Sequence, residues 1–112
     1  SGLAHIEVFQ ALAGHYDALR LERLMEAAFN EYVGRTRLLL FERETALGGA
    51  GWDMFTIDFY RDLRHYAEVS SFSAEVGDAA ARRAGFAGTA AIGPTLRQHI
   101  SLHHDTLGTV VK

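Results

Sequence analysis

The order in which the hydrophobic periodicity changes along this chain restricts its fold more than any other feature. Residues His5 to Gln10 alternate between apolar and polar side chains, which predicts a strand. From about Tyr16 to Val33, apolar residues recur every three or four positions, which predicts an amphipathic helix. Two more strands are predicted from about Thr36 to Arg43 and from Trp52 to Tyr60, and the second of these has the clearest alternation in the chain.

The rest of the chain completes this pattern. Ala46 to Gly51 is a Gly-rich connection of hairpin length between the two central strands. Arg61 to Ile100 is interpreted as several helical pieces rather than one helix, including pieces at Ala74 to Ala84 and Thr89 to His99. A last strand is predicted from about Ser101 to Val111. The predicted order is therefore β-α-β-β-α-β, with an elaborated second helical region.

This order is the ferredoxin-like arrangement, in which a four-stranded antiparallel sheet carries helices on one face. At 112 residues, the chain has the size of a single domain, so we expect residues 1–112 to form one α+β domain. The uncovered face would carry Phe, Leu and Met side chains and cannot comfortably face water. A second copy of the chain is the simplest cover, and small domains commonly gain stability by association. We therefore expect a homodimer.

Composition excludes several classes of function. The net charge of -3 and the lack of a basic run argue against nucleic acid as a partner. The longest apolar runs are only a few residues, so no segment is expected to span a membrane. The lack of cysteine excludes disulfides, thiolate catalysis and cysteine-bound metals. Ser1 is either a tag remnant or the end left by a removed signal peptide, which leaves a cytoplasmic and a periplasmic or secreted location open.

Two stretches bring in a resemblance to a known superfamily. Residues 52–63, WDMFTIDFYRDL, and residues 101–107, SLHHDTL, resemble the dimeric α/β-barrel superfamily. This superfamily includes the antibiotic-biosynthesis monooxygenases and the EthD and NIPSNAP-type proteins, and the chain looks similar to its uncharacterised bacterial members. The resemblance implies a homodimer with a cavity between sheet and helices or between the two sheets. It implies no single activity, because members include cofactor-free oxygenases, cyclases, isomerases, haem enzymes and proteins of unknown role.

The side chains that face the helices are predicted from hydrophobicity. In the first strand, Ile6 and Val8 are expected to face the helices, which leaves His5, Glu7 and Phe9 for the open face. In the third strand, the row of Phe55, Ile57 and Phe59 is expected to pack on the helices, with Met54, Thr56 and Asp58 on the open face. In the first helix, the stripe expected to face the core comprises Leu21, Leu24, Met25, Ala28, Phe29 and Tyr32, and the other side comprises Glu22, Arg23, Glu26, Asn30 and Glu31.

The last strand contains the most visible pair of titratable residues. His103 and His104 are adjacent, so they point to opposite faces of a regular strand. His104 lies on one face of the strand with Leu102 and Thr106, and His103 lies on the opposite face with Asp105 and Leu107. The sequence leaves open which of these two sets faces the cavity. One of the two histidines is expected to face a cavity or an interface.

These residues form the candidate site. The predicted catalytic residues are His5, Asp58 and one of His103 and His104, because an imidazole beside a carboxylate is a working general base. Tyr60 or Tyr66 could donate a hydrogen bond to a developing oxyanion. The predicted ligand-binding residues are Glu7, Phe9, Met54, Thr56, Tyr60 and Tyr66.

Three functions are compatible with this set. The first is a cofactor-free enzyme that oxygenates, cyclises or isomerises a small, apolar aromatic or polyketide-like compound in an otherwise apolar cavity. The second is a non-enzymatic ligand-binding or stress-response dimer, in which the same residues are ordinary interface or rim residues. The third is a metal-dependent site of histidine and carboxylate ligands. No cofactor is expected, and whether the chain is an enzyme at all stays open.

Overall fold

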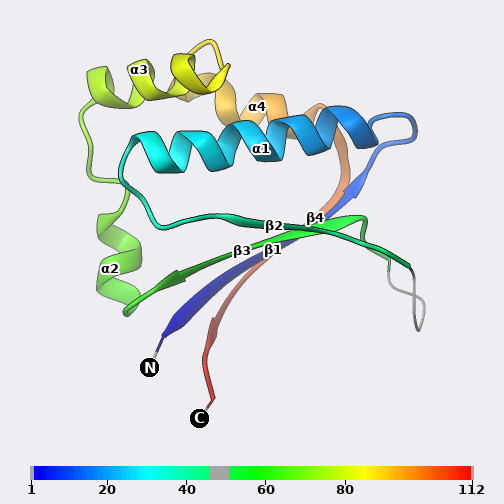
Figure 1. Cartoon of the computed structure of the whole chain (residues 1–112), viewed down its shortest axis with the longest axis horizontal. Helices are drawn as coiled ribbons and strands as arrows, with labels where there is room; N and C mark the ends of the chain where they lie inside the picture. The colour runs from blue at the N-terminus through cyan, green and yellow to red at the C-terminus, as the bar shows by residue number, and fades with distance from the viewer. Residues whose placement is uncertain (1, 46–50, 112) are drawn as a thin grey trace.

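A four-stranded antiparallel sheet with helices over one of its faces forms the frame of the protein (Figure 1). The computed structural model describes residues 2–45 and 51–111, so most of the predicted Gly-rich connection lies outside the described residues. The strands are β1 (Leu3–Ala11), β2 (Leu39–Glu42), β3 (Met54–Tyr60) and β4 (Ile100–Thr109), in the spatial order β2-β3-β1-β4. This is the predicted ferredoxin-like topology.

The helices follow the predicted order. They are α1 (Tyr16–Tyr32), α2 (Leu63–Glu68), α3 (Ala74–Ala84) and α4 (Ile92–Arg97), which a short 3-10 turn, η1 (Thr89–Ala91), precedes. α1 runs along the sheet, whereas α2 stands beside the end of β3 (Figure 1). Asp62 begins α2 by accepting a hydrogen bond from the His65 backbone N–H at 2.8 Å. No helix in residues 2–45 and 51–111 is long and apolar enough to cross a membrane.

Two hydrophobic clusters hold the layers together. One consists of Phe9, Leu19 and Met54 and joins the sheet to α1. The other joins α1 to α3, and its buried members are Phe29, Ala80, Ala81, Ala84 and Phe86. The end of the sheet that holds His5 and Asp58 belongs to neither cluster. The buried residues Leu3, Leu38 and Tyr60 lie there instead, outside both clusters.

The predicted assignment of the two sheet faces is wrong. Asp58 is only 3% exposed and Met54 is fully buried under the helices, whereas Phe59 on the other face is 47% exposed. The predicted grouping is nevertheless correct, because β1 and β3 pair His5 with Asp58, Glu7 with Thr56 and Phe9 with Met54. The prediction failed because it assumed that the more hydrophobic row must face the helices.

The predicted orientation of α1 is wrong for a related reason. Arg23 is fully buried and Glu22 and Asn30 nearly so, while Leu21 is 59% and Leu24 42% exposed. α1 has two covered sides. Phe29 and its neighbours on the predicted stripe are buried against α3, but the side that faces the sheet carries polar groups. A polar helix side can cover the sheet because it meets polar strand residues there.

The register of β4 decides between the two histidines. β1 pairs Phe9 with His103 and Glu7 with Asp105, so His103 and Asp105 share the helix-covered face with His5. Val8 pairs with His104, which therefore lies on the open face. This register selects the second of the two phases that the sequence left open.

Candidate functional site

A cavity of about 240 Å³ lies between the helix-covered face of the sheet and the helices α1 and α2. Its walls come from the strands β1 and β3, the helices α1 and α2, and the segments that follow these helices; the lining residues are His5, Glu7, Glu26, Asn30, Arg35, Leu38, Asp58, Tyr60, Tyr66, Ala67, Val69 and Ser70. Only Leu38, Ala67 and Val69 are apolar. The expectation of an otherwise apolar cavity is therefore wrong, and the cavity is suited to a ligand with polar groups.

A chain of hydrogen bonds forms the floor of this cavity. His5 Nδ1 lies 3.0 Å from Asp58 Oδ1, and the other carboxylate oxygen of Asp58 accepts a hydrogen bond from the Tyr60 hydroxyl. Cross-strand pairing of His5 with Asp58 places the two groups side by side. A buried carboxylate is stable when it is paired and hydrogen-bonded, and both conditions are met here.

His5 is held between two carboxylates. While Nδ1 faces Asp58, the other ring nitrogen, Nε2, contacts the Asp105 carboxylate. The hydrogen bond to Asp58 raises the pKa of His5 to about 9, against the opposing effect of burial, and the charges of Glu7 and Asp105 add to the rise. His5 is therefore an imidazolium at neutral pH, and both of its N–H groups act as donors.

Two tyrosines complete the wall nearest His5. The Tyr66 ring centroid lies 5.6 Å from that of His5 and 5.1 Å from that of Tyr60. Burial raises the pKa of the Tyr60 hydroxyl, and the hydrogen bond to Asp58 adds to this effect. Burial also raises the pKa of Tyr66. Both phenols therefore stay protonated at neutral pH. The Tyr60 O–H is donated to Asp58, whereas the Tyr66 O–H could donate to a ligand.

Glu7 lines the cavity, and its carboxylate is held in place by residues that lie outside the lining. His103 Nε2 lies 2.8 Å from Glu7 Oε2, and the ring of His103 stacks on that of Phe9 at 4.9 Å. Arg23 Nη2 lies 3.8 Å from Glu7 Oε1. His103 is thus a partner of Glu7 rather than part of the cavity lining.

Arg23 is a buried residue that the sequence analysis placed on the solvent side of its helix. Its Nη1 donates to Glu26 Oε2 at 2.7 Å and to Glu22 Oε1 at 3.2 Å, and its guanidinium carbon lies 4.6 Å from the centre of the Phe9 ring. Burial raises the pKa of Glu22 to about 8, so this carboxyl is mostly neutral at pH 7. No sequence signal identifies Arg23, because a charged residue on an amphipathic helix usually faces water.

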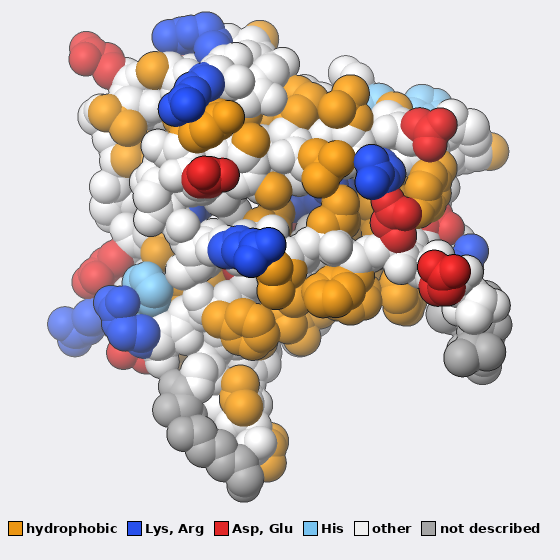
Figure 2. Space-filling model, in the orientation of Figure 1, with side chains coloured by type: hydrophobic (Ala, Val, Ile, Leu, Met, Phe, Trp, Pro, Cys, Tyr) orange, Lys and Arg blue, Asp and Glu red, His pale blue; other side chains and the backbone are white. Residues whose placement is uncertain are grey.

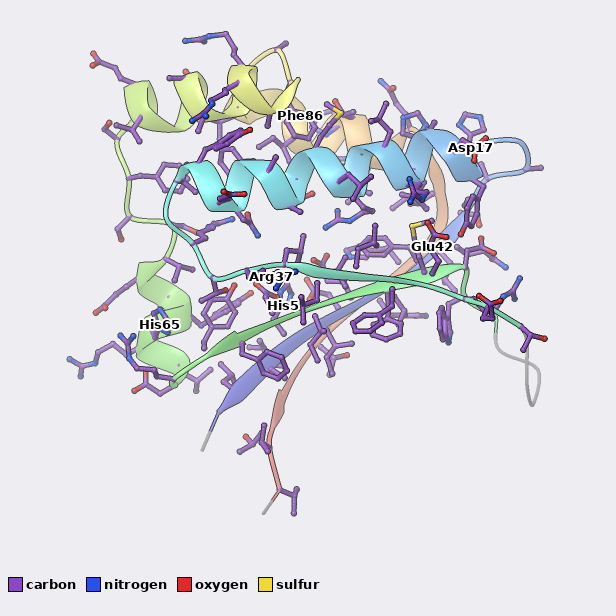
Figure 3. The ribbon with its side chains drawn as sticks, viewed as in Figure 1. His5, Asp17, Arg37, Glu42, His65 and Phe86 are labelled. Carbon is purple, nitrogen blue, oxygen red and sulfur yellow. The ribbon has the colours of Figure 1, made fainter. Side chains whose placement is uncertain are left out.

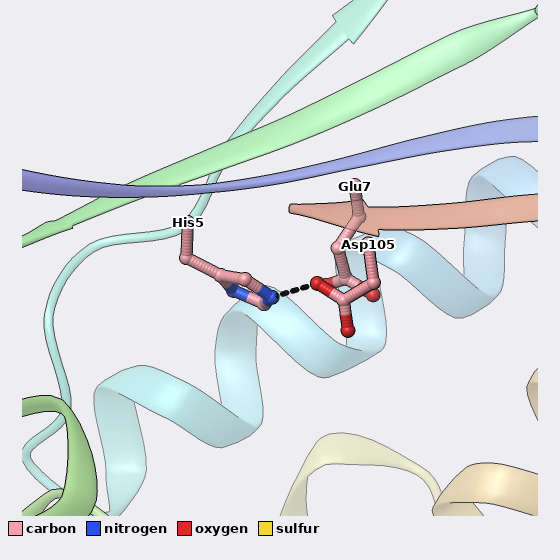
Figure 4. A group of neighbouring side chains, drawn as sticks. All are labelled: His5, Glu7 and Asp105. Atoms are coloured by element: carbon pink, nitrogen blue, oxygen red, sulfur yellow. Dashed lines mark hydrogen bonds and ion pairs between the residues drawn. The ribbon is translucent and has the colours of Figure 1, made fainter. Parts of the chain in front are cut away.

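His5, Glu7 and Asp105 could also hold a cation. Each offers one ligand atom, and these atoms all lie within 4.8 Å of one another. Figure 4 shows the three side chains extending from their strands toward the side where α1 lies. Asp58 on Nδ1 of His5 would orient the ring, as carboxylates do for metal-bound histidines.

The structure brings together part of the predicted site. His5, Glu7, Asp58, Tyr60 and Tyr66 line the cavity. Phe9, Met54 and Thr56 lie on the same covered face but are buried outside the lining. His65, which the sequence analysis did not select, is on α2, with its ring centroid 5.4 Å from that of Tyr60 (Figure 3). Sequence reasoning missed Asn30 and Arg35, which enter the cavity from α1 and the segment after it.

Solved structures with the same fold are only distantly similar in sequence. A dimeric protein of unknown function with a ferredoxin-like fold from Bacteroides fragilis matches with a TM-score of 0.63 at 9% identity, covering 97% of this chain and 96% of that one. A NIPSNAP family protein from Agrobacterium tumefaciens matches with a TM-score of 0.64 at 15% identity, covering 99% and 94%. SnoaB, a cofactor-independent oxygenase from Streptomyces nogalater, matches with a TM-score of 0.61 at 14% identity, covering 99% and 94%.

No model of a known protein family matches the sequence, and no curated protein matches it. The likenesses extend over nearly the whole chain at identities that establish the fold alone. They confirm the fold that the order of elements and the resemblance predicted. The chain thus has the ferredoxin-like fold found in the NIPSNAP family structure and in the cofactor-independent oxygenase.

Proposed function

We propose that the chain is a cofactor-free enzyme that moves protons on a small carbonyl, enol or phenol compound bound in the cavity. One observation carries this proposal: the hydrogen-bonded chain of His5, Asp58 and Tyr60 on the cavity floor. Perturbed titratable groups in a cavity are typical of functional sites. The cofactor-independent oxygenase among the structures of the same fold supports this class of chemistry.

The protonation of His5 defines its role. Because its pKa is raised to about 9, His5 would act as a proton or hydrogen-bond donor rather than as the resting base. The Asp105 carboxylate at Nε2 is half-exposed and could turn away. A substrate carbonyl oxygen would then take its place beside Nε2–H, and Asp105 would accept the proton from the carbon next to the carbonyl. The carbonyl oxygen would take the proton from His5 Nε2, so the products of this step are the enol, a neutral His5 imidazole and a protonated Asp105 carboxyl group.

Deuterium exchange tests this step. Acetylacetone is incubated with the protein in heavy water, and incorporation at its central carbon is followed by NMR against a protein-free control. We expect His5→Gln to lose the catalysed part of the exchange and His104→Gln to keep it, since His104 lies on the other face of the sheet. If wild-type protein gives the same rate as buffer while the ligand binds, the protein is the non-enzymatic binding module that forms the alternative.

A second candidate function is metal-dependent, and the geometry of His5, Glu7 and Asp105 favours it. A divalent cation bound there would polarise a substrate oxygen. Calorimetric titration with Zn²⁺ and Mn²⁺ of protein purified without a metal-affinity column is the direct test. Binding that the substitution of Asp105 by Asn abolishes would support it, and no heat at millimolar metal would exclude it.

We also propose that the open face of the sheet binds the same face of a second copy. Phe41 and Phe59 are 44% and 47% exposed there, and the rings of Phe41 and Phe55 stack at 4.6 Å. Contiguous exposed apolar side chains of this kind usually mark an interface. The solved structure from Bacteroides fragilis is described as dimeric, which supports this arrangement.

A further inference from the structure

A second hollow lies on the outer side of α1, along the segment that leads into β2. It has a volume of about 640 Å³, and its apolar lining residues are Leu24, Ala27, Ala28 and Leu38. Three charged side chains, Glu31, Arg35 and Arg37, complete the lining. Figure 2 shows hydrophobic side chains gathered over the seam between α1 and β2, with charged side chains around them. We refer to this hollow as the α1–β2 groove.

The α1–β2 groove and the cavity share a wall. Arg35 and Leu38 line both hollows. The Arg35 guanidinium donates to the Val69 carbonyl at 3.2 Å and to Asn30 Oδ1 at 3.4 Å, and it also donates to the Ser70 hydroxyl. These bonds tie the end of α1 to the end of α2. The wall consists of Leu38 and Arg35. A change of the Arg35 rotamer would open it without moving the backbone, but only by breaking these three hydrogen bonds.

The volumes and the lining groups indicate what would occupy the two hollows together. At about 240 Å³, the cavity is smaller than the roughly 300–1,000 Å³ of most small-molecule sites, and the groove supplies the missing space. In the cavity, the cations His5 and Arg35 face three carboxylates, those of Glu7, Glu26 and Asp58. This balance disfavours an anionic ligand group and favours a neutral polar one. The groove offers an apolar surface instead.

We propose that the ligand is a neutral amphiphile whose hydroxyl or carbonyl head lies in the cavity and whose apolar tail crosses the Arg35–Leu38 wall into the α1–β2 groove. The inference rests on the proposed function, since it places the head against His5. It adds a substrate class: phenols, enols or ketones that carry an alkyl chain. Leu24 would make the main tail contact because it lies at the exposed side of the groove.

Phenol and 4-hexylphenol form a matched pair of probes. Binding is measured by calorimetry and by NMR shifts of the histidine ring signals, in wild-type protein and in two variants. Leu24→Asp places a charge in the groove; Leu21→Asp places one on the same helix, at a more exposed leucine outside the groove lining. Both leucines are exposed, so both variants are expected to fold, which thermal melts would verify.

We expect wild-type protein and Leu21→Asp to bind 4-hexylphenol at least about tenfold more tightly than phenol, because the buried chain leaves water. Leu24→Asp should bind the two phenols about equally. If phenol binds beside His5 and the hexyl chain adds nothing, this inference fails while the proposed function stands. If neither phenol perturbs His5 in wild-type protein, both fail. A loss of molecular mass in Leu24→Asp by light scattering would make the groove a contact between copies and overturn the inference.

Discussion

On the side of the sheet that the helices cover, β1 and β3 carry His5, Glu7 and Asp58, whereas on the open side the same two strands carry aliphatic and aromatic side chains. Only part of the covered side is polar, since Phe9 and Met54 on the same side pack on Leu19 of α1 in the usual apolar way. Polar residues can be covered here because α1 brings Arg23, Glu26 and Asn30 to meet them. The difference shows that coverage by helices need not build a hydrophobic core over the whole covered face. It can also enclose a polar cavity, and the apolar side then remains for association.

The largest effect is expected from a substitution among the polar residues on the helix-covered face. Substituting Asp58 by Asn would remove the charge that holds the His5 proton, so the pKa of His5 should fall from about 9 toward 6.5. We expect catalysed deuterium exchange to fall by about a hundredfold or more. Histidine NMR titration and the exchange assay measure the two effects. Asp105→Asn is the matched control for the His5 pKa alone, where we expect a smaller change, because Asp105 is itself the proposed base and its loss would also stop the exchange. An unchanged pKa in Asp58→Asn would contradict the assignment.

The next largest effect is expected from a charge placed on the apolar, open face of the sheet. Phe59→Asp places a charge in the proposed interface and, by symmetry, places a second one in the partner copy. We expect the dissociation constant of the dimer to rise by about a hundredfold or more, since unpaired charges would have to leave water. Sedimentation or light scattering over a concentration series measures it. A wild-type mass near 12.4 kDa at micromolar concentration would already refute the dimer.

A smaller effect is expected in how the free energy of unfolding depends on pH through His5. The pKa of His5 is raised from 6.5 to about 9 by folding, so the stability it contributes is fully present below pH 6.5 and is lost as pH rises to about 9. Partial exposure of its partner Asp105 reduces the effect, which we expect to be about 2 kcal/mol. Urea unfolding of wild type and His5→Gln across this range should show the gap between them closing. A constant gap would mean that His5 is not the titrating group.

The smallest effect concerns the helix side that covers the sheet. Because burial raises the pKa of Glu22 from 4.5 to about 8, stability tied to its neutral form is lost as pH rises from about 4.5 through 8. Glu22→Gln keeps a neutral side chain of nearly the same shape, so at pH 4, where the carboxyl is mostly neutral in both the folded and the unfolded chain, we expect a change below about 1 kcal/mol. Above pH 8 the variant should become the more stable protein. Chemical unfolding at pH 4 and pH 9 measures both; a variant that is equally destabilised at both values would rule out this titration.

The order of helices and strands, and which side chains share a face of each, could be predicted from the sequence alone. Strand periodicity places His5 with Glu7 and Asp58 with Thr56, and it separates His103 from His104, whichever way the sheet turns. The recurrence of apolar residues every three or four positions also predicted the helix from about Tyr16 to Val33, which the structure has at Tyr16–Tyr32. These features are local, because they depend on residues within two to four positions of one another.

Which face of each strand and helix contacts which neighbouring element became known from the structure alone. The phase of β4 depends on a register with β1 that pairs Glu7 with Asp105, almost a hundred positions away in the chain. The burial of Arg23 depends on the side of α1 that meets the sheet, and hydrophobicity favoured the other side. The periodicity of a sequence shows which side chains share a face of a strand or helix, but not which neighbouring element that face contacts. Polar faces can be buried when they are buried against each other, and that match exists only once strands and helix are assembled.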